Sequence, residues 1–189
     1  MEIGLFFGSF NPIHIGHLII AKAMIENTDI DKVWFVVSPQ NPFKKSKSLL
    51  HEFDRLDMVR AAVYDSYDMD VSDVEFHMPK PSYTVDTLAY LTDKHPDYKF
   101  KLIIGEDNLS HFSKWKNYEQ ILEHGLLVYP RPHTVKSEFH DHPKVQMIDA
   151  PMVDISATFI RKCVQNNHSI EYLVPKEVKE LILSRKYYL

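Results

Sequence analysis

Residues 2–20 read EIGLFFGSFNPIHIGHLII, and this stretch decides the fold. Its first part, residues 2–7, is an apolar run that stops at Gly8, as is typical of a strand buried on both faces. A polar loop follows over residues 8–17, and the largely apolar residues 16–26 predict a helix. A buried strand that passes through a short loop into a helix is the first unit of an α/β fold.

The same strand-then-helix pattern continues along the chain. Further strands are predicted from apolar runs at 32–38, 99–104 and 125–129, from a weaker run at 144–148, and from partial alternation at 70–77. Further helices are predicted at 52–65, 84–94, 156–166 and 175–186, where Pro175 suits a first helical turn. This order predicts a Rossmann-like, doubly wound parallel sheet with flanking helices. We expect one domain over residues 1–189, with residues 155–189 as a small helical C-terminal part.

Composition narrows the class of protein. The chain has 189 residues, 44% of them hydrophobic and 25% charged, which is ordinary for a globular protein. The single cysteine, Cys163, cannot form an internal disulfide, and with no N-terminal signal pattern a reducing cytoplasm is the expected location. No apolar run approaches a membrane span. A net charge of −4 argues against binding a nucleic-acid polymer, which needs a basic face.

The loop at residues 8–17 carries the chemistry. It lies at the carboxyl edge of the predicted sheet, where ligands bind in open α/β folds. Gly8 and Ser9 allow a tight turn, and the following helix start is an anion site flanked by His14 and His17. Alternatively, His17 packs in the helix and His14 lies at the surface. Two histidines three apart at a strand-to-helix junction favour the functional interpretation. The loop lacks both the G-x-G-x-x-G and the P-loop patterns.

This loop resembles the G-[ST]-F-[DN]-P-x-H-x-G-H signature of the nucleotidyltransferase superfamily, which includes nicotinate- and nicotinamide-mononucleotide adenylyltransferases. Four more stretches are similar to motifs of the bacterial nicotinate-nucleotide adenylyltransferases. They are SYTVDTL at 82–88, IGEDNLSHFSKW at 104–115, ISATFIR at 155–161 and YLVPKEV at 172–178. The combination spans nearly the whole chain and is far more specific than any one motif.

Class I aminoacyl-tRNA synthetases share the H-x-G-H element, and KKSKS at 44–48 looks like their lysine motif. In a synthetase that motif lies far downstream, whereas here it follows the second predicted strand and ISATFIR takes the downstream position. The chain also departs from the adenylyltransferase pattern at three positions. Asn11 stands where Asp is frequent, Ala157 where a second Ser is frequent, and Phe43 where a His often precedes the lysine.

The resemblance implies transfer of the adenylyl group from ATP to nicotinate mononucleotide in NAD biosynthesis. It implies catalytic roles for His14, His17 and Arg161 in binding phosphates. The implied ATP-binding residues are Gly8, Ser9, Phe10, His14, His17, Lys44, Gly105, Asp107, Ile155, Ser156, Thr158 and Arg161. A Mg²⁺ ion is expected with ATP, bound mainly through its oxygens and water, with no metal-binding residues assigned in the protein.

For the mononucleotide, the implied substrate-binding residues are Asn11, Ser82, Tyr83, Thr84, Trp115 and Arg131. Trp115 would stack on the pyridine ring, although without the resemblance a core aromatic covering a helix end is the favoured interpretation. Asp107 would orient a ribose hydroxyl, or cap a helix over residues 108–112, or both.

Several alternatives stay open at this point. The acceptor could be nicotinamide mononucleotide, pantetheine phosphate or another phosphorylated molecule, or the chain could be a nucleotide sensor without turnover. A tRNA-binding module fits least well. The motifs leave the oligomeric state open. The histidines within residues 133–142 could bind a metal, but a polar loop is the simpler interpretation, and Cys163 is expected in the core.

Overall fold

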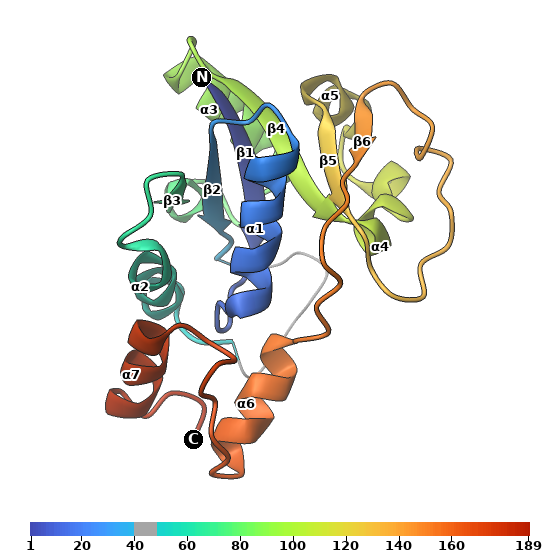
Figure 1. Ribbon diagram of the computed structural model, residues 1–189. Helices are drawn as coiled ribbons and strands as arrows, with labels where there is room; N and C mark the ends of the chain where they lie inside the picture. Colours follow the sequence, from blue (N-terminus) through green and yellow to red (C-terminus); the bar gives the residue numbers. More distant parts are fainter. Residues whose placement is uncertain (40–48) are drawn as a thin grey trace.

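The computed structural model describes residues 1–39 and 49–189 (Figure 1). Within this part of the chain, six parallel strands form one sheet in the order β3-β2-β1-β4-β5-β6. The strands are β1 (Glu2–Gly8), β2 (Lys32–Val37), β3 (Met69–Ser72), β4 (Lys99–Gly105), β5 (Leu126–Tyr129) and β6 (Val145–Met147). The predicted parallel α/β sheet is confirmed.

Helices connect the strands. They are α1 (Ile15–Asn27), α2 (Glu52–Val63), α3 (Thr84–Lys94), α4 (Glu106–Leu109), α5 (Tyr118–His124), α6 (Ala157–Gln165) and α7 (Lys176–Ser184), with 3₁₀ turns η1 (Val74–His77) and η2 (Phe112–Lys114). The bounds of α1, α2, α3, α6 and α7 agree with the predicted ranges to within two residues.

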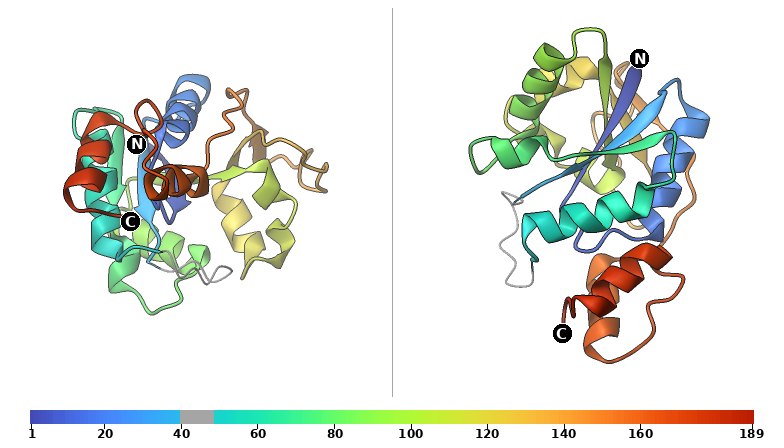
Figure 2. Two further views of the ribbon diagram at one scale, coloured as in Figure 1. Left: turned by 90° about the horizontal axis from the view of Figure 1, so that it is seen from below. Right: turned by 90° about the vertical axis from the view of Figure 1, so that its left-hand side faces the viewer.

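Buried side chains divide the helices between the two faces of the sheet. One hydrophobic cluster joins α1, α2, α6 and α7 to one face, and a second joins α3 and α5 to the other. Figure 2 shows the helices of the two groups from two further sides. Successive strand residues alternate between the two clusters, as Leu5 and Phe6 do in β1. The strand order reverses between β1 and β4, so their carboxyl ends form the crevice where α/β folds bind ligands.

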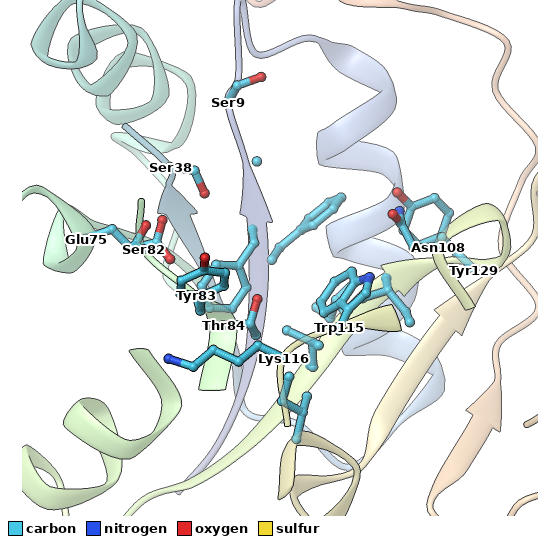
Figure 3. Close-up of a pocket in the computed structure, with 18 residues that line it drawn as sticks. Ser9, Ser38, Glu75, Ser82, Tyr83, Thr84, Asn108, Trp115, Lys116 and Tyr129 are labelled. Atoms are coloured by element: carbon cyan, nitrogen blue, oxygen red, sulfur yellow. The ribbon is translucent and has the colours of Figure 1, made fainter. Parts of the chain in front are cut away.

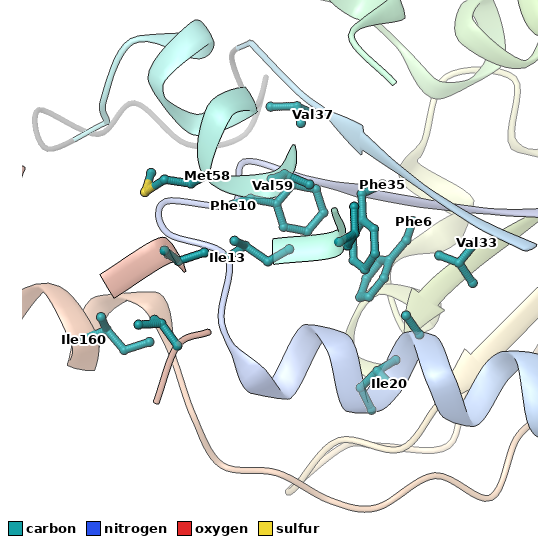
Figure 4. Packing of buried hydrophobic residues seen from close by; sticks show 14 of the residues in the cluster. Phe6, Phe10, Ile13, Ile20, Val33, Phe35, Val37, Met58, Val59 and Ile160 are labelled. Atoms are coloured by element: carbon teal, nitrogen blue, oxygen red, sulfur yellow. The ribbon is translucent and has the colours of Figure 1, made fainter. Parts of the chain in front are cut away.

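The first cluster extends below the signature loop. Phe6 and Phe35 pack against Phe10 of the loop, and Ile160 of α6 reaches the same apolar region (Figure 4). Cys163 is buried in this cluster, which confirms the prediction that it packs in the core.

The C-terminal helices are anchored to α2. Tyr187, just after α7, donates a hydrogen bond through its hydroxyl to Asp54 Oδ1 at 2.6 Å. Arg185 Nη1 lies 2.9 Å from Asp57 Oδ2. Val178 and Ile182 of α7 are buried in the first cluster. The end of the chain is thereby brought next to α2, far from it in sequence.

Some element predictions were wrong. Only the first part of 70–77 is a strand, because the chain turns at Asp73 into η1 and buries Glu75. The sequence analysis missed α4 and α5, which are too short to show a helical period. Pro175 precedes α7 rather than lying in its first turn.

Within the described residues, no helix is long and apolar enough to cross a membrane.

Candidate active site

The two signature histidines lie at the start of α1, stacked on each other. Their ring centroids are 3.7 Å apart with 27° between the ring planes. The His14 backbone N–H donates to His17 Nδ1 at 3.2 Å, so the proton of a neutral His17 ring is on Nε2. The edges of Phe10 and Phe6 enclose the His17 ring at 5.1 and 6.0 Å. The prediction that His14 and His17 form a pair at the helix start is therefore matched by their geometry.

Burial decides the charge of both rings. It lowers the pKa of His14 to about 4, with a smaller contribution from the positive charge of Arg131. The pKa of His17 lies well below its usual value, chiefly through burial and then through His14 and Arg131. Both rings are neutral at pH 7, so each can donate a hydrogen bond from one nitrogen. His14 Nδ1 is buried and makes no hydrogen bond within the described residues.

Glycine at position 16 follows from this packing. A Cβ at Gly16 would lie 3.1 Å from His14 Nδ1. Gly8 is similarly constrained, because a Cβ there would lie 2.7 Å from the ring of Phe10. Phe10 itself is buried and adopts a positive φ of 44°. The structure places its side chain in the core, so a contact between Phe10 and ATP would have to involve its backbone.

Arg131 follows β5 and lies beside the histidines. Its guanidinium carbon is 5.0 Å from the Tyr129 ring centroid, and Nη2 donates to the Tyr129 hydroxyl at 3.4 Å. Its Nε is 3.9 Å from Asp107 Oδ1 and makes no hydrogen bond in the described part of the chain. Arg131 and both histidines line one small pocket, together with Ile155. This places Arg131 with the predicted phosphate-binding groups rather than with Trp115.

The ISATFIR segment approaches the signature loop from α6. Arg161 Nη1 donates to the Asn11 backbone carbonyl at 2.8 Å, and Nη2 donates to Thr158 Oγ1 at 3.2 Å. Ser156 caps α6 by accepting a hydrogen bond from the Phe159 backbone N–H at 3.2 Å. Arg161 thus joins this segment to the signature loop, and Thr158 contacts the same guanidinium.

A larger pocket opens at the carboxyl ends of β1 and β4 (Figure 3). It brings together residues that the sequence analysis assigned to ATP and to the mononucleotide. Those residues are Gly8, Ser9, Ser82, Tyr83, Thr84, Gly105 and Trp115. The side chains of Tyr83, Thr84 and Trp115 lie around the same hollow in Figure 3. Trp115 also contacts Phe112 at 5.5 Å between ring centroids, so it lines the pocket and packs on a helical turn at once.

The Ser82–Thr84 segment leads into α3. Tyr83 is the N-cap residue of α3 and makes no side-chain capping hydrogen bond. Its backbone carbonyl accepts from the N–H groups of Asp86 and Thr87, so those of Thr84 and Val85 are the first-turn donors left for an anion in the pocket. The Ser82 hydroxyl is buried beside the carboxylate of Glu75.

Sequence reasoning missed several pocket residues: Ser38, Glu75, Asn108, Lys116 and Tyr129. Ser38 directly follows β2 and Tyr129 ends β5. Because ligands bind at the carboxyl ends of the strands in such folds, inspecting the end of every predicted strand would have identified both residues. Glu75 is buried, accepts a hydrogen bond from Thr87 Oγ1 at 2.9 Å, and has its pKa raised by burial. Nothing in its local pattern distinguished it from an exposed strand carboxylate.

Two assigned residues have other partners here. Asn11 turns its side chain away from the pocket, and its Oδ1 accepts hydrogen bonds from Leu50 N at 3.3 Å and the Tyr188 hydroxyl at 3.0 Å. Asp107 is inside α4, whose N-cap is Gly105, so the prediction of an Asp107 N-cap was wrong. Its carboxylate faces Arg131 instead. Lys44 lies outside the described residues.

The polar loop at 133–142 is used structurally. His140 Nε2 lies 2.9 Å from Glu106 Oε1. Hydrogen bonds from Thr134 and His140 lower the pKa of Glu106. Within residues 1–39 and 49–189, no group of three His, Cys, Asp or Glu side chains is arranged to hold a metal ion.

The fold and this site define a nucleotidyltransferase, and the comparisons with known proteins agree. A family model described as Cytidylyltransferase-like matches residues 5–163. A Cytophaga hutchinsonii protein named "Probable nicotinate-nucleotide adenylyltransferase" is 63% identical over 100% of this chain and 98% of its own length. A Flavobacterium psychrophilum protein of the same name is 51% identical over 100% of this chain and 99% of its own. The chain belongs to the nicotinate-nucleotide adenylyltransferase family.

Solved structures support the fold. The Plasmodium falciparum nicotinic acid mononucleotide adenylyltransferase complexed with NaAD superposes with a TM-score of 0.81 at 23% identity. The match covers 99% of this chain and 97% of that one. This likeness shows the Rossmann-like architecture.

Proposed function

We propose that this protein transfers the adenylyl group of ATP to nicotinate mononucleotide, giving nicotinate adenine dinucleotide and pyrophosphate. One observation carries the proposal. A single pocket at the sheet's switch point joins the signature loop, through Gly8 and Ser9, to the Ser82–Thr84 segment and Trp115. The family membership supports the same activity, since full-length relatives carry that name.

The reaction needs positioning rather than acid–base catalysis. A phosphate oxygen of the mononucleotide attacks the α-phosphorus of ATP. The bond from that phosphorus to the α–β bridging oxygen breaks, and pyrophosphate leaves with the bonding electron pair. The nucleophile is already an anion, so no general base is required. Two neutral histidines, His14 buried and His17 half-buried, suit this step, because they donate hydrogen bonds without competing for a substrate proton.

The phosphate-binding roles follow from position. His14 and His17 would contact the α-phosphate and its bridging oxygen at the start of α1. Arg161, with Ser156 and Thr158, would hold the β- and γ-phosphates. Arg131 adds a positive charge beside the histidines, where charge on the phosphates increases in the transition state. Lys44 remains a prediction for the same phosphates.

The pyridine end of the mononucleotide would occupy the larger pocket. Trp115 would stack on the ring, and the backbone N–H groups at the start of α3 would receive the carboxylate. A carboxamide has no negative charge for these donors, so the acid is favoured over the amide. Lys116 lies on the same side, with its Nζ 4.6 Å from the Tyr83 ring centroid and 2.9 Å from Asp86 Oδ2, so its charge is paired with a carboxylate of the protein.

Mg²⁺ would accompany ATP. Such an ion is held mainly by phosphate oxygens and water. When bound, the ion would neutralise charge on the phosphates and on departing pyrophosphate.

Pyrophosphate release tests the proposal. The assay compares nicotinate mononucleotide, nicotinamide mononucleotide and pantetheine phosphate with ATP and Mg²⁺. We expect strong preference for the acid mononucleotide and a loss of roughly 100-fold or more in kcat for His17→Ala. His168→Ala is the matched control, because His168 is exposed and lies on a loop after α6.

Two other results of this assay would contradict parts of the proposal. Turnover with a different acceptor would keep the phosphate site and contradict the roles of Thr84 and Trp115. Binding of ATP without turnover of any acceptor would make the chain a nucleotide sensor and contradict the proposed activity.

A further inference from the structure

The last residues of the chain reach the signature loop. Tyr188 is the penultimate residue and is buried to 9% exposure. Its hydroxyl donates a hydrogen bond to Asn11 Oδ1 at 3.0 Å, across 177 positions of sequence. The C-terminal end thus lies against the loop that carries both histidines.

Asn11 is a junction within that loop. Its side-chain oxygen receives Tyr188 and the Leu50 backbone N–H, while its backbone carbonyl receives Arg161 Nη1 at 2.8 Å. Asn11 is buried to 5% exposure and lies three residues before His14. A shift of Asn11 would therefore move the carbonyl that binds Arg161. It would also move the segment that leads to the stacked histidines.

The Tyr188 hydroxyl is suited to donate a hydrogen bond at every physiological pH. Burial raises the pKa of Tyr188, so it keeps its proton over the physiological range. Its neighbour Tyr187 makes a comparable hydrogen bond, 2.6 Å long, but to Asp54 on α2 rather than to the loop. Tyr187 therefore attaches the C-terminal end to α2, whereas Tyr188 attaches it to the signature loop.

We propose that Tyr188 is a positioning residue, whose hydrogen bond to Asn11 holds the signature loop and Arg161 in the geometry needed for in-line adenylyl transfer. The expected effect of Tyr188 on catalysis rests on the proposed function. Its effect on the position of the loop does not depend on that function. Tyr188 touches neither substrate nor the reacting atoms in this assignment.

The test compares Tyr188→Phe with Tyr187→Phe, each of which removes one hydroxyl from the same turn. Tyr187→Phe loses the hydrogen bond donated to Asp54 and the one accepted from Arg185 Nη1 at 3.0 Å, whereas Tyr188→Phe loses the one donated to Asn11. Both should lower the unfolding temperature, and Tyr187→Phe at least as much as Tyr188→Phe. Only Tyr188→Phe should lower kcat, by roughly tenfold or more, with KM for ATP nearly unchanged. Asn11→Ala should lower kcat as well, and adding Tyr188→Phe to it should cost no further activity, because both act through one contact.

A second readout does not depend on turnover. The imidazole C–H resonances of His14 and His17 in the NMR spectrum should shift in Tyr188→Phe and stay in place in Tyr187→Phe. If the two variants agree in kcat and in the histidine resonances, the proposal is wrong. If the wild type turns over no mononucleotide, the proposed function fails, and the resonances alone then support or overturn the positioning role.

Discussion

At the residue scale, the site depends on histidines that the fold keeps uncharged. A stacked, buried pair beside an arginine cannot hold a proton easily, because both burial and Arg131 oppose a second positive charge. Keeping both rings uncharged lowers the stability of the folded state where free histidines would bind protons. It also provides two hydrogen-bond donors in fixed positions at the helix start. Stability and function are thus linked through the same two rings.

This linkage predicts how stability depends on pH. In the unfolded chain a histidine takes up a proton near pH 6.5, whereas folded His14 stays neutral down to about pH 4. Below pH 6.5 the unfolded state binds more protons, so the free energy of unfolding should fall as pH drops from about 6.5 to 4. Chemical denaturation across this range would measure it. His14→Asn should reduce the slope and the exposed-site variant His168→Asn should not; equal slopes in both would contradict the prediction.

A second residue-scale prediction concerns Gly8. A methyl group there would collide with the Phe10 ring, which is buried and cannot swing into solvent. We expect Gly8→Ala to cost about 2 kcal/mol, which is a fall of roughly 4–8 °C in unfolding temperature for a chain of this size. Differential scanning calorimetry would detect it. An unchanged transition would mean that the loop relaxes without cost.

At the element scale, α2 holds the ends of two strands through one side chain. Arg55 is fully buried, and its guanidinium donates to the backbone carbonyls of Ser9, Ser38, Pro39 and Leu50. Those carbonyls belong to the loops after β1 and β2 and to Leu50, which lies two residues before α2. One helix therefore fixes the edge of the sheet where the pocket opens.

Replacing Arg55 should be costly for this reason. Arg55→Met leaves several buried carbonyls without donors, and we expect a loss of about 3 kcal/mol or more in unfolding free energy. Arg60→Met is the control on the same helix, because the Arg60–Asp73 ion pair is exposed and should contribute less than about 1 kcal/mol. Urea denaturation would separate the two. Equal effects would show that the carbonyls find other partners.

The same scale shows what the sequence could and could not reveal. Long apolar runs such as β1 and β4 are visible because burial on both faces leaves no polar position. By contrast, η1 follows a strand-like alternation, and only the fold reveals that Glu75 turns inward to meet Thr87. The motif residues that line the pocket were predictable by resemblance. Contacts such as Arg55 to Ser9 or Tyr188 to Asn11 were not, because they join segments that no local pattern relates.

At the scale of the whole molecule, the C-terminal helices share a core with the sheet. Ile160 of α6 and Ile182 of α7 belong to the same buried cluster as Phe6 and Phe35. We therefore propose that residues 1–189 form a single folding unit, with 155–189 as a helical part of it.

A single unit should unfold in one step. Thermal unfolding followed by far-ultraviolet circular dichroism and by calorimetry should give coincident transitions, with calorimetric and van't Hoff enthalpies equal. Proteolysis during the transition should release no stable fragment ending near residue 155. Two separated transitions would make the C-terminal part an independent domain.

The placement of the two tryptophans gives the molecule a built-in optical reporter. Trp115 lines the pocket, while Trp34 packs among His95, Tyr98 and Phe100 and is not one of the pocket residues. A pyridine ring stacked on Trp115 would quench its emission and leave that of Trp34 unaffected. A Trp34→Phe variant would therefore carry one fluorophore at the pocket, whose intensity would follow occupancy of the pyridine site during a titration.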